Sequence, residues 1–155
     1  MKKSYDNFGR YLEEFEIGSI YKHNVVRQIR DEDNRLFCKL THNFHPLHLD
    51  EEYAKKSFHG KIVVVGTYVA SLVVGLSVED ISGKAIANLS YENITHHAPV
   101  FIGDTLRAET KIISVRESRT KPDRGVVKVE TRAFNQNGEQ VLSLQRTILI
   151  PKKRE

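Results

Sequence analysis

The segment that most limits the fold is an uncharged run of 17 residues, 62–78, between Lys61 and Glu79. A helix that is apolar on all sides has to be enclosed, either by lipid or by protein. The run is at the short end of what crosses a bilayer, and it contains glycine, serine and threonine. We therefore expect a helix buried inside a soluble fold, and no membrane span.

The rest of the chain contains enough strand to enclose that helix. Alternating apolar residues bounded by turns predict strands over 86–97, 105–115, 126–135 and 140–150, and Asn137-Gly138 is a strong hairpin signal. A strand is also expected over 19–28, and short helices over 31–40, with Asp31 as N-cap, and 51–57, with Asp50 as N-cap. The predicted fold class is α+β: a curved antiparallel sheet of about five strands wrapped around one long apolar helix.

Length and cysteine content suit one ordinary domain in a reducing compartment. The 155 residues are expected to form a single domain, 1–155, with loose ends at 1–10 and 151–155. The one cysteine, Cys38, excludes an intrachain disulfide framework. No apolar signal segment follows Met1, so a cytoplasmic location is expected.

Positive charge is concentrated in the last third of the chain. The net charge is +4, and residues 105–155 hold 12 Lys/Arg against 6 Asp/Glu. This balance suits either a solvated face or a phosphate-bearing ligand. No helix-turn-helix, zinc-finger or RNA-recognition pattern accompanies it, so no nucleic-acid partner is expected.

The segment Thr41–Asp50 holds three of the seven histidines. His48 is either a core histidine or a proton carrier, since imidazole titrates near neutral pH. Pro46 breaks the helical spacing of the three imidazoles and no cysteine assists them, so no metal site is expected. His59-Gly60 precedes the apolar run. The pair is equally consistent with a simple turn and with the start of a helix whose backbone N–H groups bind an oxyanion.

Taken together, these residues resemble a known family. Thr41-x-Asn43-x-x-Pro46-Leu47-His48-x-Asp50, followed by Tyr53-Ala54 and His59-Gly60, resembles the motif of the MaoC-like, (R)-specific enoyl-CoA hydratases. Segment 98–106 resembles the family's sheet-edge signature, and segments 116–125 and 132–136 resemble its itaconyl-CoA and mesaconyl-CoA hydratase branch. The resemblance implies a hot-dog fold, a homodimer or larger homo-oligomer, and reversible hydration of an enoyl-CoA without a cofactor.

The resemblance also implies roles for single residues. His48 matches the family's catalytic histidine, Asn43 stands where the family has its catalytic aspartate, and Gly60 is placed at the helix-start donor. Substrate contacts are expected from three further residues: His45, His59 and Ile62.

The asparagine is the main departure, because an amide orients water but cannot deprotonate it. Three readings stay open: His48 performs the proton transfers while Asn43 positions water, His45 assumes one proton role, or the site is degenerate. The functional alternatives are correspondingly a non-catalytic acyl-CoA-binding subunit of a heteromeric complex and a hot-dog thioesterase. The basic loop 116–124 is either a site for a distal carboxylate or a solvated hairpin.

Overall fold

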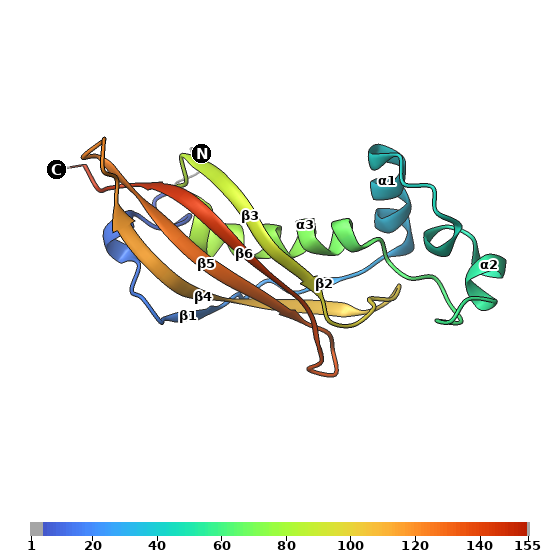
Figure 1. The fold of residues 1–155 in the computed structure, drawn as a ribbon. Coiled ribbons are helices and arrows are strands. Elements are labelled where there is room, and N and C mark those ends of the chain that lie inside the picture. The colour runs from blue at the N-terminus through green and yellow to red at the C-terminus, as the bar shows by residue number, and fades with distance from the viewer. Residues whose placement is uncertain (1–4, 155) are drawn as a thin grey trace, which may run out of the picture.

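A computed structural model describes residues 5–154; residues 1–4 and 155 lie outside that range. A curved antiparallel sheet wraps around one central helix, as the α+β prediction requires (Figure 1). The strand order is β1-β4-β5-β6-β3, and β2 also pairs with β4. The strands are β1 (Ile20–Lys22), β2 (Arg27–Gln28), β3 (Ala87–His96), β4 (Thr105–Glu117), β5 (Arg124–Phe134) and β6 (Gln140–Pro151).

The central helix is shorter than the uncharged run that predicted it. Helix α3 (Gly66–Ser77) continues into a π-helical turn, η3 (Val78–Ser82). The residues ahead of it are extended: Val63 forms a bridge with Phe101, and the Val64 N–H donates to the Val100 carbonyl at 2.8 Å. The expected helical start at residue 62 is therefore wrong, because a short apolar run does not distinguish a buried extended segment from a helix.

The other helices are α1 (Asp31–Thr41), α2 (Glu51–Lys55) and the 3-10 turns η1 (Leu12–Glu14) and η2 (Pro46–His48). The prediction of Asp50 as an N-cap is confirmed, because its Oδ1 accepts the Tyr53 N–H at 3.0 Å. Asp31 is not a cap: Arg30 holds the N-cap position of α1, and Asp31 pairs with Arg35 at 2.6 Å.

The strand predicted over 19–28 is two strands separated by a buried histidine. The His23 ring lies between Asp80 Oδ2, at 2.6 Å from Nδ1, and Thr110 Oγ1, at 2.7 Å from Nε2. These contacts tie the first strands to the end of the central helix. They require polar partners far along the chain, which the alternation of residues 19–28 does not show.

The core lies between α3 and the concave face of the sheet. Val69, Val73 and Leu76 of α3 pack in one buried cluster with residues of three strands: Leu106, Ala108, Ala133, Leu142 and Leu144. Burying each large aliphatic side chain contributes on the order of 2 kcal/mol. The sheet therefore encloses the uncharged helix that the sequence requires to be buried.

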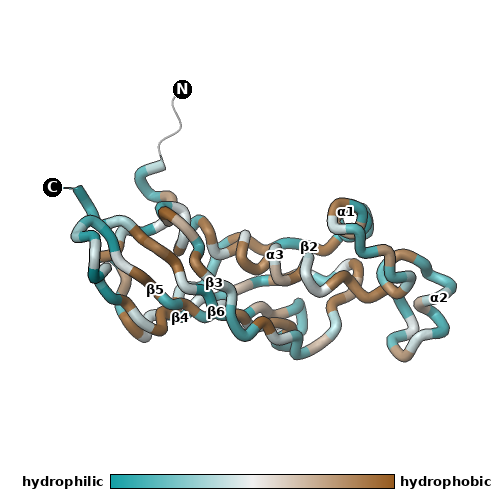
Figure 2. The backbone as a smooth tube through the Cα atoms, turned by 45° about the horizontal axis from the view of Figure 1, so that its top comes forward, coloured by the Kyte–Doolittle hydropathy of each residue, from teal (hydrophilic) through white to brown (hydrophobic). Residues whose placement is uncertain are grey.

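Helices α1 and α2 and the loop between them extend beyond the sheet at the N-terminal end of α3 (Figure 1). We call residues 31–61 the overhang. Figure 2 shows that α2 and its surroundings are mainly hydrophilic, whereas hydrophobic residues concentrate along α3 and the strands. The histidine-rich loop is therefore held at one end of the molecule.

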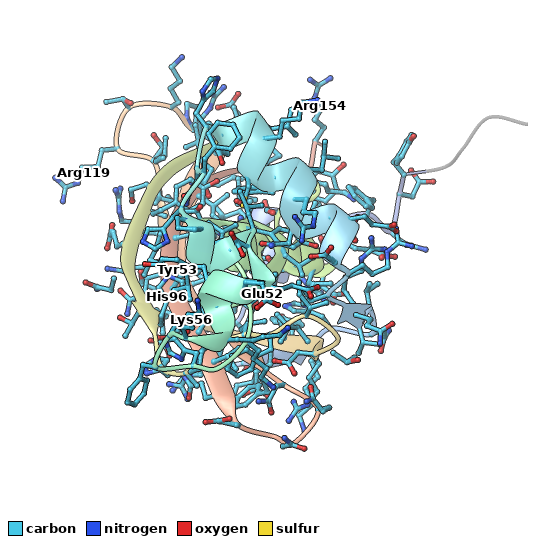
Figure 3. All side chains as sticks on the ribbon, turned by 90° about the vertical axis from the view of Figure 1, so that its right-hand side faces the viewer. Glu52, Tyr53, Lys56, His96, Arg119 and Arg154 are labelled. Atoms are coloured by element: carbon cyan, nitrogen blue, oxygen red, sulfur yellow. The ribbon has the colours of Figure 1, made fainter. Side chains whose placement is uncertain are left out.

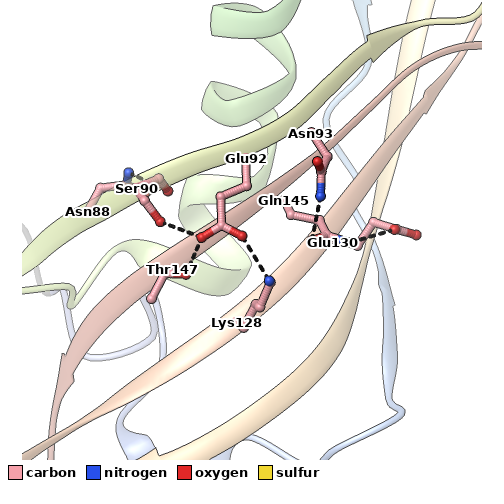
Figure 4. Close-up of polar contacts among 8 residues, drawn as sticks. All are labelled: Asn88, Ser90, Glu92, Asn93, Lys128, Glu130, Gln145 and Thr147. Carbon is pink, nitrogen blue, oxygen red and sulfur yellow. Dashed lines mark hydrogen bonds and ion pairs between the residues drawn. The ribbon is translucent and has the colours of Figure 1, made fainter.

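The outer face of the sheet carries a polar network (Figure 4). Glu92 on β3 pairs with Lys128 on β5 at 2.8 Å and accepts hydrogen bonds from Ser90 and from Thr147 on β6. The network spans three neighbouring strands. Among residues 5–154, no helix is long and apolar enough to cross a membrane.

Candidate active site

The histidine-rich loop begins where α1 ends. His42 takes a left-handed conformation (φ 57°) that closes the helix, and the Asn43 N–H donates to the Cys38 carbonyl at 3.0 Å. Cys38 is fully buried, and burial raises the pKa of its thiol. A buried thiol in apolar surroundings is an unreactive packing group.

Asn43 and His45 shape the loop through local hydrogen bonds. Asn43 Oδ1 accepts the His45 N–H at 3.3 Å, and His45 Nδ1 accepts the Leu47 N–H at 3.1 Å, which caps η2. An accepting Nδ1 requires the His45 ring to be neutral at that nitrogen. The rings of His45 and His48 lie with centroids 5.7 Å apart.

His48 is held by the extended segment ahead of α3. Its Nδ1 lies 2.6 Å from the Val63 carbonyl, and the Val63 N–H returns a 3.3 Å bond to the Leu47 carbonyl. A carbonyl only accepts, so Nδ1 carries the proton and Nε2 of the neutral ring is left with a lone pair. Nε2 has no hydrogen-bond partner within residues 5–154. The half-buried ring is thus oriented as a proton acceptor.

Asn34, which the sequence analysis missed, links this histidine to the start of the central helix. It is fully buried on α1; its Nδ2 donates to the His48 carbonyl at 3.0 Å, and its Oδ1 accepts the Val65 N–H at 3.1 Å. Asparagine is a poor residue for a helix interior. That local mismatch is the only signal the sequence offered.

The structure corrects the position given to Gly60. Gly60 is exposed (φ 71°) and donates its N–H to the Ser57 carbonyl at 3.2 Å, whereas α3 begins six residues later at Gly66. The backbone N–H groups of Gly66 and Thr67 have no acceptor among the described residues. The free helix-start donors are therefore at Gly66.

The expected substrate-contact residues lie in the overhang or directly after it. Ile62 is buried and lines a cavity of about 390 Å³ together with Gly60, Lys55 and Lys61. His59 is exposed and stacks edge-on against Phe101, with centroids 6.4 Å apart. His45 lies beside His48, as described above.

Two further expectations concern charged and metal-binding groups. Within residues 5–154, no group of three or more His, Cys, Asp or Glu side chains is arranged to hold a metal ion. The basic loop 116–124 joins β4 to β5 beside the C-terminus, at the end of the sheet opposite the overhang (Figure 1). Within one chain it does not face the histidine loop.

Residues 14–133 match the MaoC like domain family. The chain belongs to this family. A mesaconyl-CoA hydratase of Cereibacter sphaeroides is 37% identical over 147 residues, which cover 95% of this chain and 43% of the relative. An (R)-specific enoyl-CoA hydratase of Aeromonas caviae is 30% identical over 115 residues, which cover 74% of this chain and 81% of the relative.

The solved structures identify the fold. A Mycobacterium tuberculosis protein with a double hotdog fold superposes with a TM-score of 0.88 at 18% identity, covering 95% of this MaoC-like chain and 46% of that protein. The hot-dog prediction is confirmed. The chain spans less than half the length of the mesaconyl-CoA hydratase it matches.

Proposed function

We propose that this MaoC-like chain adds water reversibly across the 2,3 double bond of a short enoyl-CoA, including branched or dicarboxylic ones. The observation that carries the proposal is the orientation of His48, whose Nδ1 is bound to the Val63 carbonyl while Nε2 is free to accept a proton. The relatives named as hydratases support the reaction class.

The addition of water and the stabilisation of the enolate then each have groups on this chain. His48 Nε2 takes a proton from water as its oxygen adds to C3, a general-base role. Asn43 orients that water through its amide, since it has no proton-accepting carboxylate. The free N–H groups at Gly66 stabilise the enolate-like thioester oxygen, a role in which the positive end of the α3 dipole assists.

The proposal requires no cofactor, because hydration moves protons and forms a C–O bond without net redox change. It also places the reaction in the cytoplasm. A single buried, unpaired cysteine suits a reducing compartment.

The acting form is proposed to be a homodimer joined through β3. This ten-residue strand ends the sheet, so one row of its backbone groups has no strand partner within residues 5–154. Leu89, Tyr91 and Ile94 on it are 53%, 56% and 47% exposed. A second copy of the same strand would cover both the apolar side chains and the open edge. The double hotdog of the structural relative supports this arrangement.

The test is direct. Purified protein is mixed with crotonyl-CoA, mesaconyl-CoA and related thioesters, and the loss of conjugated-thioester absorbance is followed while free thiol is assayed. Loss of absorbance without thiol is the expected result. Thiol release would replace the proposal with a thioesterase, and thermal stabilisation by ligand without turnover would replace it with a binding subunit.

A further inference from the structure

His96, at the end of β3, packs against the first residue of the central helix. A Cβ built on Gly66 would lie 2.8 Å from Cε1 and 2.9 Å from Nε2 of the His96 ring. Real Cβ atoms almost never lie this close to a heavy atom of another residue. The His96 ring therefore fills space that is open only because residue 66 is glycine. One edge of the imidazole is therefore beside the free N–H groups that begin α3.

A bulge in β3 turns His96 toward the helix. Pairing with β6 shifts register between Glu92 and Thr95, and Asn93 within the shift has a positive φ of 51°. Tyr91 and Ile94 consequently line one cavity of about 370 Å³ against α3, although three positions separate them. Side chains alternate along a strand, so His96 faces α3 with Ile94. Bulges next to active sites commonly re-aim a side chain in this way.

The neighbouring histidine shows the opposite orientation. His97 Nε2 lies 2.8 Å from Ser143 Oγ on β6. By contrast, neither nitrogen of the His96 ring has a hydrogen-bond partner among residues 5–154. His96 is also exposed. Figure 3, viewed from the overhang end, shows the His96 side chain beside the β3 ribbon. An unpartnered imidazole is thus accessible at the site.

The two histidines contact the same short segment, residues 63–66. Val63, which holds His48, is three residues before Gly66, which contacts His96. Three extended residues span at most about 10 Å. A small enoyl thioester whose oxygen meets the Gly66 N–H is therefore within reach of both rings.

We propose that His96 is a second catalytic histidine, which donates the proton that C2 receives during hydration. This inference rests on the proposed hydratase function. The water oxygen forms the bond to C3 and loses its proton to His48 Nε2, the electron pair of the C2–C3 double bond passes through the enolate, and C2 takes a proton from protonated His96. Solvent then returns the extra proton of His48 to His96, so one water is consumed. His96 supplies the second proton-transfer group that Asn43 cannot.

The decisive experiment compares His96→Gln with His97→Gln, a matched control one residue away on the other face of the strand. Hydration of the preferred enoyl-CoA and exchange of the C2 hydrogen of the 3-hydroxyacyl-CoA in D₂O are both measured, with circular dichroism to show that each variant is folded. His96→Gln is expected to lower hydration and exchange by about 10²- to 10⁴-fold, while His97→Gln stays within about twofold of wild type.

A second measurement excludes a structural cause. Added imidazole is expected to restore hydration by His96→Gly several-fold and to leave His97→Gly unchanged. Wild-type rates in His96→Gln, or a His96→Gly defect that imidazole does not relieve, would overturn the role of His96 while leaving the hydratase proposal intact. No hydration by the wild-type protein would overturn both.

Discussion

The amide nitrogen of Asn34 on α1 donates a 3.0 Å hydrogen bond to the main-chain carbonyl of His48. The same side chain accepts the N–H of Val65, the residue before α3. One buried amide thus fixes the distance between the proton acceptor of the proposed site and its oxyanion donors. Asn34 adds to the direct bonds between Val63 and the histidine loop, so the alignment of the two elements depends on α1 as well as on the extended segment.

Replacing Asn34 with alanine is expected to reduce both stability and activity. The buried Val65 N–H and the partly buried His48 carbonyl lose their partner, and leaving a buried group unpaired costs about 1–3 kcal/mol. Urea unfolding measures the free energy, and hydration is assayed under conditions where the variant remains folded. Asn88→Ala is the control, since Asn88 is exposed and makes one local bond to Ser90. An unchanged unfolding free energy in Asn34→Ala would show that water replaces the amide.

His48→Gln is expected to lower hydration by at least about 10²-fold, because glutamine cannot accept and release a proton. The fold should persist, since the His48 ring is only half buried. His42→Asn is the control: it removes another histidine of the loop, and asparagine tolerates the left-handed conformation found there. Turnover by His48→Gln at the wild-type rate would remove His48 from the mechanism.

Local patterns predicted what is encoded locally. The loop containing Asn43 and His48, the cap at Asp50 and the four long strands all follow from neighbouring residues. Gly60 was misplaced because the segment after it is held extended by Val100 and Phe101, about 35 to 40 residues away along the chain. Asn34 and His96 were missed for the same reason: each meets its partner only in the folded chain.

The exposed edge of β3 is expected to be where two copies associate. Leu89→Lys places a charge on that strand, and edge lysines oppose strand pairing. Light scattering after size exclusion should show a shift from dimer to monomer. Ile17→Lys provides the control, because Ile17 is similarly exposed at 62% but lies outside the strand. A dimer that survives Leu89→Lys would locate the interface elsewhere.

Arg146 on β6 is a buried cation without a carboxylate partner among residues 5–154. It is 2% exposed, donates from Nη2 to Ser77 Oγ at 2.8 Å, and its Nε has no acceptor in that range. Desolvation lowers its pKa, so burial opposes the charged form.

Arg146→Met is therefore expected to leave the free energy of unfolding unchanged or to raise it by about 1–2 kcal/mol, because the desolvation penalty disappears. Urea unfolding at neutral pH provides the measurement. The exposed pair Arg132–Glu130 supplies the control: Arg132→Met should change stability by less than about 1 kcal/mol. If Arg146→Met lowered the free energy of unfolding by more than about 2 kcal/mol, the hydrogen bonds that Arg146 donates to hydroxyl groups would stabilise the fold by more than its desolvation costs.

Glu92 should make stability depend on pH in the acid range. Its hydrogen bond with Lys128, together with those from Ser90 and Thr147, holds the pKa of its carboxyl below the ordinary value (Figure 4). A lowered folded-state pKa contributes stability above the unfolded-state pKa of about 4.3, and this contribution is lost as pH falls. Wild type and Glu92→Gln should therefore differ in unfolding free energy at pH 7 and converge below about pH 3.

Glu16→Gln, which alters an exposed carboxyl outside the network, is the control and should have the unfolding free energy of wild type at both pH values. A difference between wild type and Glu92→Gln that is constant with pH would show that the carboxylate charge is not what stabilises the network.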